Sequence, residues 1–395
     1  MDLEVGFVKR IYLDNAATSY PKAPGLGDAM KHFVDDIGDN VNRSGYDSLA
    51  ADEMVFETRE MVAALFNFPT PENVIFTLNI TYGLNFVLKG ILRAGDHVIV
   101  SSMEHNAVMR PLGQLENQGI KFSRVACDEE GHLDVNSFDQ HIQPNTKMVV
   151  LTHASNVAGT VLPIEQIGAI CEKKGILFVI DTAQTAGLLD LDFERVKASA
   201  LAFTGHKGLL GPQGIGGLLL SKQVAESMDA LVSGGTGSLS EYEEVPPYLP
   251  DKFEAGTPNL PGIYGLRHAL RYIDAIGLDA IREKEMQLAA ALLDGLGDFK
   301  SARIAGPKGV NDRMAVVSVD FEGYDNAQVA YYLDKHHGIR TRCGLHCAPS
   351  AHKTLGTFPQ GTVRLSPGHF NTQDEIHQTL SAIRTVLREL ENTWR

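Results

Sequence analysis

One lysine of this 395-residue chain stands where an amine could do chemistry. Lys207 lies in the sequence LAFTGHKGLLGPQGIGGLLL, beside several glycines and between apolar runs at 200–203 and 215–220 that predict two buried strands. Because burial disfavours an ammonium, such a lysine has a lowered pKa and is partly free base at neutral pH. A free amine can condense with a carbonyl as a Schiff base. The alternative is a loop lysine whose charged head reaches water.

Polar side chains stand after the other apolar runs of strand length. These runs and the residues that follow them are 74–76 with Thr81, 97–100 with His105, 148–151 with Asn156, and 176–180 with Asp181. Helical stretches such as 163–174 separate most of the runs, an alternation typical of a mostly parallel sheet covered on both faces. Ligands of such sheets gather beyond the carboxyl ends of the strands. We therefore expect these groups and Lys207 at one sheet edge.

Each group also has a structural interpretation of its own. Asp181 or Thr81 could cap a helix, and His105 could be a histidine without a chemical role. Their joint placement at one edge argues against these interpretations. The turn before Thr81 offers free backbone N–H groups and a hydroxyl to an anion.

The set of a lysine, an acid, an imidazole and an anion-binding turn suits pyridoxal phosphate. That cofactor needs a lysine for its aldehyde, a carboxylate for its pyridine nitrogen and a cradle for its phosphate. Asp181 is the expected carboxylate, and His105 is expected to lie over the ring. Nicotinamide chemistry fits less well, because no G-x-G-x-x-G opens a helix after the first strand, and no P-loop is present.

Composition limits the remaining possibilities. A hydrophobic fraction of 44% and a charged fraction of 21% are those of an ordinary globular protein. The formal net charge of −14 argues against nucleic acid or an anionic membrane as a partner. We expect a cytoplasmic protein, since neither a signal pattern nor a membrane-length apolar run is seen. Four cysteines do not make a disulfide framework.

The last third of the chain has helix, strand and turn signals of its own and predicts a smaller domain. It contains two cysteines four residues apart, Cys343 and Cys347, in TRCGLHCAP. A zinc site would need a second pair of ligands, which this sequence lacks, so we expect no metal. A redox pair would be expected to have the C-x-x-C spacing, which these two cysteines lack. The third interpretation is a reactive thiol whose pKa is lowered by His346 and Arg342.

With these residues in view, the chain resembles the cysteine desulfurases, within the class V, fold-type I pyridoxal-phosphate enzymes. The resemblance rests on YLDNAAT, MEHNAV, HASNVAGT, IDTAQTAG, TGHKGLLGPQGIGG, FEAGTPN and RCGLHCAP, which occur in the family's order over nearly the whole length. The form GLHCAP is similar to group II, the SUF-type branch. The resemblance implies an α/β fold with a mixed, mostly parallel seven-stranded sheet in a cofactor domain at 11–276. A smaller α+β domain would follow at 277–395, with residues 1–10 packed on it.

The resemblance also implies roles for single residues. Lys207 would hold the cofactor and move the substrate's Cα proton, and Cys347 would take the substrate sulfur as a persulfide. The other residues implied to bind the cofactor are His105 on the ring, Asp181 on the ring nitrogen, Gln184 on the ring hydroxyl, Asn156, Ile80, and the phosphate ligands Thr81, Thr204 and His206. Gly256 and Thr257 would reach the phosphate from the partner subunit of a homodimer. The substrate would be bound by Arg364, Asn156, Asn15 and Arg43.

Some positions depart from the family's pattern. Tyr46 stands where related chains often carry a histidine, Cys343 is an extra thiol, and Pro367 closely follows Arg364. The expected reaction converts L-cysteine to L-alanine and passes sulfur from Cys347 to an acceptor, which could be a protein. The alternatives of the same fold are a selenocysteine lyase, a lyase of cystine or another C–S bond, and a class V aminotransferase or epimerase. A cofactor-binding scaffold without turnover is the alternative from another class.

Overall fold

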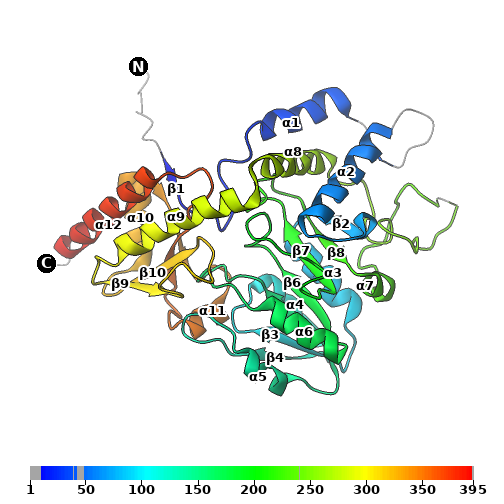
Figure 1. Ribbon diagram of the computed structural model, residues 1–395, viewed down its shortest axis with the longest axis horizontal. Helices are drawn as coiled ribbons and strands as arrows, with labels where there is room; N and C mark the ends of the chain where they lie inside the picture. Colours follow the sequence, from blue (N-terminus) through cyan, green and yellow to red (C-terminus); the bar gives the residue numbers. More distant parts are fainter. Residues whose placement is uncertain (1–9, 39, 42–48, 240, 394–395) are drawn as a thin grey trace.

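The computed structural model describes residues 10–38, 40–41, 49–239 and 241–393. A seven-stranded sheet forms its larger part, with the strand order β2-β8-β7-β6-β5-β3-β4 (Figure 1). The strands are β2 Val74–Thr77, β3 His97–Ser101, β4 Lys121–Val125, β5 Thr146–Thr152, β6 Leu177–Asp181, β7 Ala200–Thr204 and β8 Gly216–Leu220. Only β8 runs against its two neighbours, so the mixed, mostly parallel sheet expected from the resemblance is confirmed.

Helices cover both faces of this sheet because the inner positions of its central strands are apolar on both sides. In β5, Met148 and Val150 pack into one core with α3 (Ile80–Ile91), α4 (Asn106–Glu116) and α7 (Lys222–Ser227). Val149 and Leu151 point the other way. They share a second core with α2 (Leu49–Leu65), α6 (Ile164–Lys174) and α8 (Leu260–Ile276). Side chains of a strand alternate between faces, so a strand buried on both sides is a continuous apolar run.

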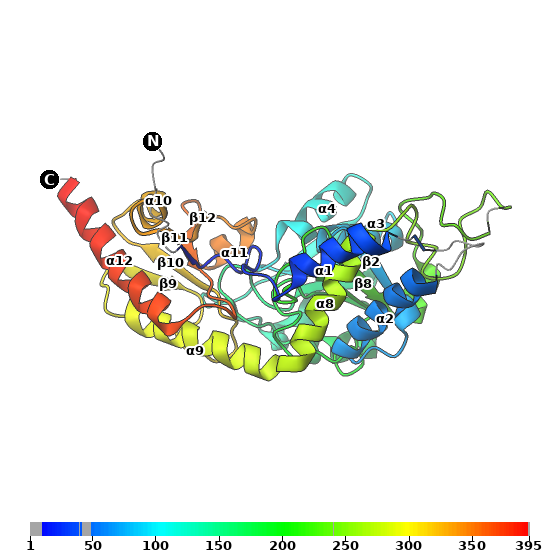
Figure 2. The same ribbon diagram turned by 90° about the horizontal axis from the view of Figure 1, so that it is seen from above.

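The smaller part is built on a four-stranded antiparallel sheet in the order β12-β13-β10-β9. Its elements are α9 Leu278–Leu296, β9 Ala302–Ala305, β10 Val317–Phe321, α10 Asn326–His337, β12 Arg342–Gly344, α11 Pro349–Thr354, β13 Thr362–Leu365 and α12 Gln373–Thr393. Helices α9, α10 and α12 bury their apolar sides with β10 and β13 in a separate core. This lobe lies at the left of Figures 1 and 2, and in Figure 2 α9 runs along its lower edge toward α8.

The N-terminal segment passes through the small lobe before it reaches the large one. Strand β1 (Ile11–Tyr12) pairs in parallel with β11 (Ile339–Arg340), and Leu13 is fully buried in the small core. The chain then crosses to α1 (Leu26–His32) and a π-helical turn (Phe33–Ile37), which lie over α8. Residues 1–9, expected on the small lobe, lie outside the described residues.

The sequence misses several short strands. Strand β4, KFSRV, is an edge strand whose Lys121 and Arg124 are exposed, so its apolar signal is weak. Strands β9, β11 and β12 are similarly short and polar. In the described part of the chain, no helix combines the length and apolar character needed to cross a bilayer.

Candidate active site

The turn that carries Lys207 joins β7 to β8 at the carboxyl edge of the large sheet. Three backbone hydrogen bonds close it, from Gly205 N to Ile215 O at 2.9 Å, from Leu210 N to Lys207 O at 2.8 Å and from Gly211 N to Gly205 O at 2.8 Å. Lys207 is partly buried, and this burial lowers the pKa of its amine to about 8, while the carboxylate of Asp181 opposes the change. The lowered pKa expected from the sequence is therefore found.

A glycine allows the helix that follows β2 to lie against this edge. Gly216 is paired with Thr204, and a Cβ at Gly216 would stand 2.6 Å from Phe203 O and 2.9 Å from the Cα of Asn79. Asn79 is the N-cap of α3, where its side chain accepts a hydrogen bond from Tyr82 N at 3.2 Å. Any larger residue at position 216 would separate the start of α3 from the end of β7.

Two polar atoms next to Lys207 are buried and have no partner among the described residues. They are the Oγ1 of Thr204 and the Nδ1 of His206. Burial, together with the charges of Lys207 and Lys22, lowers the pKa of His206 to about 4, so the ring is neutral at pH 7. A hydroxyl and a neutral imidazole can both donate hydrogen bonds to phosphate oxygens.

Asp181 is the last residue of β6 and lies in the middle of the sheet edge. Its backbone pairs with Thr152 of β5 and Ala202 of β7, and its Oδ1 accepts a hydrogen bond from Ala183 N at 2.9 Å. Burial raises the pKa of the Asp181 carboxyl, and the hydrogen bond and the ammonium of Lys207 oppose that rise. A buried carboxylate is stabilised by a cation, and a protonated pyridine nitrogen is such a cation.

His105 begins α4 at the end of β3. Its Nδ1 accepts a hydrogen bond from Ala107 N at 3.0 Å, so the proton of the neutral ring lies on Nε2. Burial, followed by the charge of Lys207, lowers the pKa of His105 to about 4. The ring is therefore an uncharged donor within electrostatic reach of the lysine.

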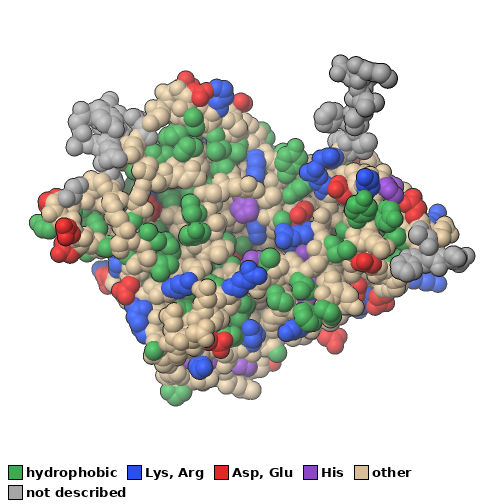
Figure 3. Space-filling model, turned by 180° about the vertical axis from the view of Figure 1, so that it is seen from behind, with side chains coloured by type: hydrophobic (Ala, Val, Ile, Leu, Met, Phe, Trp, Pro, Cys, Tyr) green, Lys and Arg blue, Asp and Glu red, His purple; other side chains and the backbone are tan. Residues whose placement is uncertain are grey.

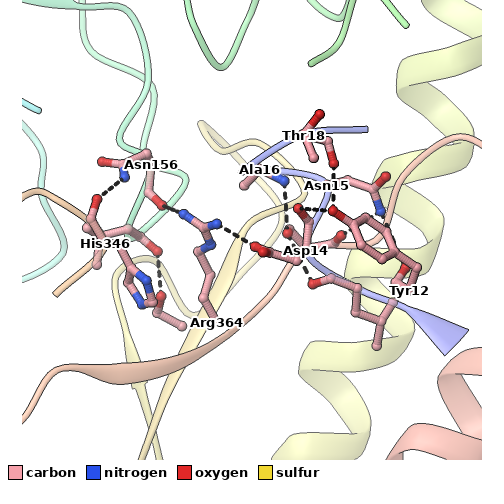
Figure 4. Close-up of polar contacts among 12 residues, drawn as sticks. Tyr12, Asp14, Asn15, Ala16, Thr18, Asn156, His346 and Arg364 are labelled. Carbon is pink, nitrogen blue, oxygen red and sulfur yellow. Dashed lines mark hydrogen bonds and ion pairs between the residues drawn. The ribbon is translucent and has the colours of Figure 1, made fainter. Parts of the chain in front are cut away.

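Arg364 connects three parts of the chain, as Figure 4 shows. It lies on β13 and is only 2% exposed. Its Nη1 donates to Asn156 O at 3.0 Å, and its Nη2 donates to Asp14 Oδ1 at 2.6 Å. Its Nε is buried and has no partner in the described part of the chain, so this N–H is available to an anion. Histidines and basic side chains also gather near the centre of the face in Figure 3, although the chain is acidic overall.

Cys347 is exposed and stands on a loop that is fixed by both lobes. Its carbonyl accepts a hydrogen bond from Asn106 N at 2.8 Å, directly after His105. The preceding carbonyl, of His346, accepts one from Asn156 Nδ2 at 2.7 Å, and the His346 ring lies 3.1 Å from Thr362 Oγ1. His346 and Cys347 both have positive φ, at 48° and 58°, a conformation that such contacts must hold in place.

This loop was expected to hold a reactive thiol whose pKa is lowered by His346 and Arg342. For His346 a charged ring is not found, because burial lowers the pKa of His346 itself to about 2. A neutral ring gives no such charge. Cys343 and Cys347 are both free thiols, and burial raises the pKa of the half-buried Cys343.

Other predicted residues are placed around this centre or away from it. Gln184 donates from Nε2 to Ala16 O at 3.1 Å, and Asn15 donates to Ser366 O at 3.0 Å. Ile80 is buried at the start of α3 and Thr81 beside it is exposed. Arg43 lies outside the described residues, as does Tyr46.

Gly256 and Thr257 do not line the same space as Lys207. Both are exposed on the loop before α8 and line a separate cavity of about 290 Å³ with Leu78 and Tyr82. Leu78 is 50% exposed and Tyr82 is 48% exposed.

Three charged residues of the site were missed in the sequence. Asp14 pairs with Arg364, and Lys22 donates to the carbonyl of His206 at 2.7 Å. Glu104 is buried between β3 and β5, where it accepts from Ser101 Oγ at 2.6 Å and from Thr152 N at 3.0 Å. Burial raises the pKa of Glu104 to about 8. Glu104 and Asp14 stand in the motifs MEHNAV and YLDNAAT, which were the available signals; Lys22 had none.

Comparisons with known proteins agree with this geometry. Residues 11–379 match the family described as aminotransferase class V. A probable cysteine desulfurase of Pyrococcus abyssi is 33% identical over 97% of this chain and 96% of its own length. One from Methanothermobacter thermautotrophicus is 34% identical over 93% and 92%.

This chain belongs to the cysteine desulfurase family. Two solved structures support the membership. The apo structure of cysteine desulfurase from Thermococcus onnurineus NA1 superposes with a TM-score of 0.89 at 32% identity, covering 96% of this chain and 95% of the other. The cysteine desulfurase CsdA of Escherichia coli gives 0.86 at 28% identity, with the same coverage. Members of this family depend on pyridoxal phosphate.

The residues of this desulfurase-family chain fit that cofactor. The unpartnered Thr204 hydroxyl and His206 nitrogen suit a phosphate, the buried Asp181 suits a pyridinium, and Lys207 suits an aldehyde. The unpartnered Oδ1 of Asn156 accepts hydrogen bonds and so suits a donor such as the ring hydroxyl.

Proposed function

We propose that this protein is a pyridoxal-phosphate-dependent cysteine desulfurase that forms L-alanine from L-cysteine and receives the sulfur on Cys347. The observation that carries the proposal is the anchoring of the Cys347 loop. Its carbonyls are hydrogen-bonded to Asn106 and to Asn156, and Asn156 in turn contacts Arg364. These hydrogen bonds connect the loop of an exposed thiol to Arg364 through Asn156.

The cofactor would be held by Lys207, Asp181, Thr204 and His206, with His105 on its ring. When bound, it supplies an electron sink for charge that develops on the substrate's Cα. The Nε of Arg364 would donate to the substrate carboxylate, since it is the guanidinium nitrogen without a partner among the described residues. An amine with a pKa near 8, as Lys207 has, can take and return a proton near neutral pH.

The sulfur step involves Cys347 directly. Its thiolate would attack the sulfur of the bound substrate, so that an S–S bond forms while the Cβ–S bond breaks. The electron pair of the broken bond stays with the carbon fragment, which takes up a proton at Cβ and leaves as alanine. One cysteine and one thiol therefore give one alanine and one persulfide, with no external oxidant. The exposure of Cys347 allows an acceptor, such as a sulfur-carrier protein, to remove the sulfur afterwards.

The test compares Cys347 with Cys343, a second free cysteine on the neighbouring strand β12. We expect Cys347→Ala to lose sulfur release and protein-bound persulfide, while Cys343→Ala keeps both within about twofold. Alanine formation is measured by chromatography, and mass spectrometry locates an added sulfur atom. Full sulfur release by Cys347→Ala would refute the persulfide role. A wild-type protein that binds the cofactor but forms no alanine would refute the desulfurase assignment.

We also propose that the active unit is a homodimer. The support is the exposure of Leu78, Tyr82, Gly256 and Thr257 around one apolar cavity, since large exposed apolar groups gathered at one place mark contact surfaces. Sedimentation of the wild type should give twice the chain mass of 43.0 kDa. Tyr82→Glu should shift it toward the monomer, and an unshifted dimer would place the interface elsewhere.

A further inference from the structure

Lys22 is a partly buried lysine whose partners are all uncharged. Its Nζ donates to His206 O at 2.7 Å, to Ser19 Oγ at 3.1 Å and to Thr18 Oγ1 at 3.3 Å. Among the described residues, no carboxylate lies within ion-pair distance of it. Burial accordingly lowers its pKa to about 8. The three protons of an ammonium are thus matched by three neutral oxygens.

The carbonyl oxygen of His206 is the centre of this arrangement. Besides Lys22, it faces Ser19 N at 2.9 Å, Ser19 Oγ at 3.1 Å and Thr18 Oγ1 at 3.1 Å. A carbonyl oxygen has two lone pairs, so four donors compete for it. The bond from Lys22 is the shortest and the only charge-assisted one, and such bonds are roughly twice as strong as neutral ones. Lys22 also holds both hydroxyls, which can then donate to the carbonyl.

This carbonyl belongs to the peptide bond that joins His206 to Lys207. Because a peptide unit is planar, fixing its oxygen fixes the direction from which the Lys207 side chain leaves the backbone. The same unit orients the His206 ring, one of the two groups with an unpartnered buried atom. The remaining bonds of the turn, at Gly205 and Leu210, do not involve this oxygen.

We propose that Lys22 is a positioning residue that clamps the His206 carbonyl and so orients Lys207 and His206 toward the cofactor. The inference rests on the proposed use of pyridoxal phosphate, and it assigns Lys22 no contact with cofactor or substrate. It also explains why an unpaired cation is kept in a partly buried place, where its charge is a cost to folding.

Lys22→Met separates this role from a structural one, because methionine fills a similar volume and carries no charge. We expect the cofactor-free variant to melt no lower than the wild type. The bound cofactor, followed by its visible absorption band during dialysis, should be lost about tenfold faster, as for a lost charge-assisted hydrogen bond. The band should also form more slowly when cofactor is added to the cofactor-free protein. Lys22→Arg should restore part of both rates.

Lys31→Met is the matched control, since Lys31 is an exposed lysine on α1 paired with Asp35, and both rates should stay unchanged. A Lys22→Met protein that retains cofactor like the wild type would overturn the inference, as would a lower melting temperature with unchanged retention. If Lys22→Met does not fold, Thr18→Val, which removes one hydroxyl of the clamp, must show the same direction of change or the inference fails. A wild-type protein that takes up no cofactor would refute the proposed function itself.

Discussion

Removing the charge of Asp14, which pairs with Arg364, should have two opposite effects. It should lower the stability of the protein and raise its affinity for carboxylate ligands. Arg364 is buried, the Asp14 side chain is 19% exposed, and a single contact of 2.6 Å joins them. Asp14→Asn keeps a hydrogen-bond acceptor but removes the charge. Hydrogen bonds to charged groups contribute about 1.5–3 kcal/mol, so we expect the variant to lose about 2 kcal/mol of stability.

The same variant should bind carboxylate ligands more tightly. A substrate carboxylate on Arg364 would stand roughly 6 Å from that of Asp14, since both share one guanidinium. At an effective dielectric constant of about 20–40, two such charges repel by about 1.5–3 kcal/mol. Loss of that repulsion should lower the dissociation constant of L-alanine. We expect a net decrease of about tenfold, because poorer positioning of Arg364 offsets part of the gain.

The assay combines thermal unfolding of the cofactor-free protein with titration of the cofactor-bound protein by L-alanine. Asp35→Asn is the control, because Asp35 is an exposed carboxylate on the π-helical turn, and it should change neither quantity. A variant Asp14→Asn that binds L-alanine more weakly than the wild type would show that Asp14 orients Arg364 rather than competes for it. The electrostatic reasoning would then be wrong.

Three further outcomes follow from the site. Cofactor uptake by the cofactor-free protein needs the neutral amine of Lys207, whose pKa is lowered to about 8. The uptake rate should therefore rise about tenfold from pH 6 to pH 7 and level off above pH 9. A stopped-flow profile that is flat across this pH range would contradict this expectation. Asp181→Asn should lower the alanine-forming rate by at least about a hundredfold while a visible band remains, and near-normal turnover would remove Asp181 from the site. Gly216→Ala should cost about 1–3 kcal/mol of stability by overpacking against Phe203 O, whereas Gly113→Ala, in open space on α4, should be neutral or stabilising in the same melting experiment.

The sequence predicts the centre of the large sheet well because burial on both faces leaves unbroken apolar runs. Such runs mark β5, β6 and β7, and the residues after them do lie along one edge, since these strands are parallel. Strand β2 reaches the same edge because it is antiparallel to β8, which is antiparallel to β7.

Long-range polar pairs could not be predicted in this way. Asp14 and Arg364 are 350 positions apart, and Lys22 and His206 are 184 apart. No periodicity connects such residues, and only the folded path of the N-terminal segment brings them together, with Asp14 against β13 and Lys22 against the turn after β7. The charge state of His346 likewise depends on its burial in the folded loop, which residue type does not reveal.

The path of the first described residues has a consequence for how the protein is made. Residues 11–22 leave the ribosome before their partners, which include Ile339, Arg364 and Ser366. Domains commonly fold as units from the N-terminus during synthesis. Here residues 11–22 must wait for the segment at 339–366, so cofactor capture should follow the synthesis of that segment.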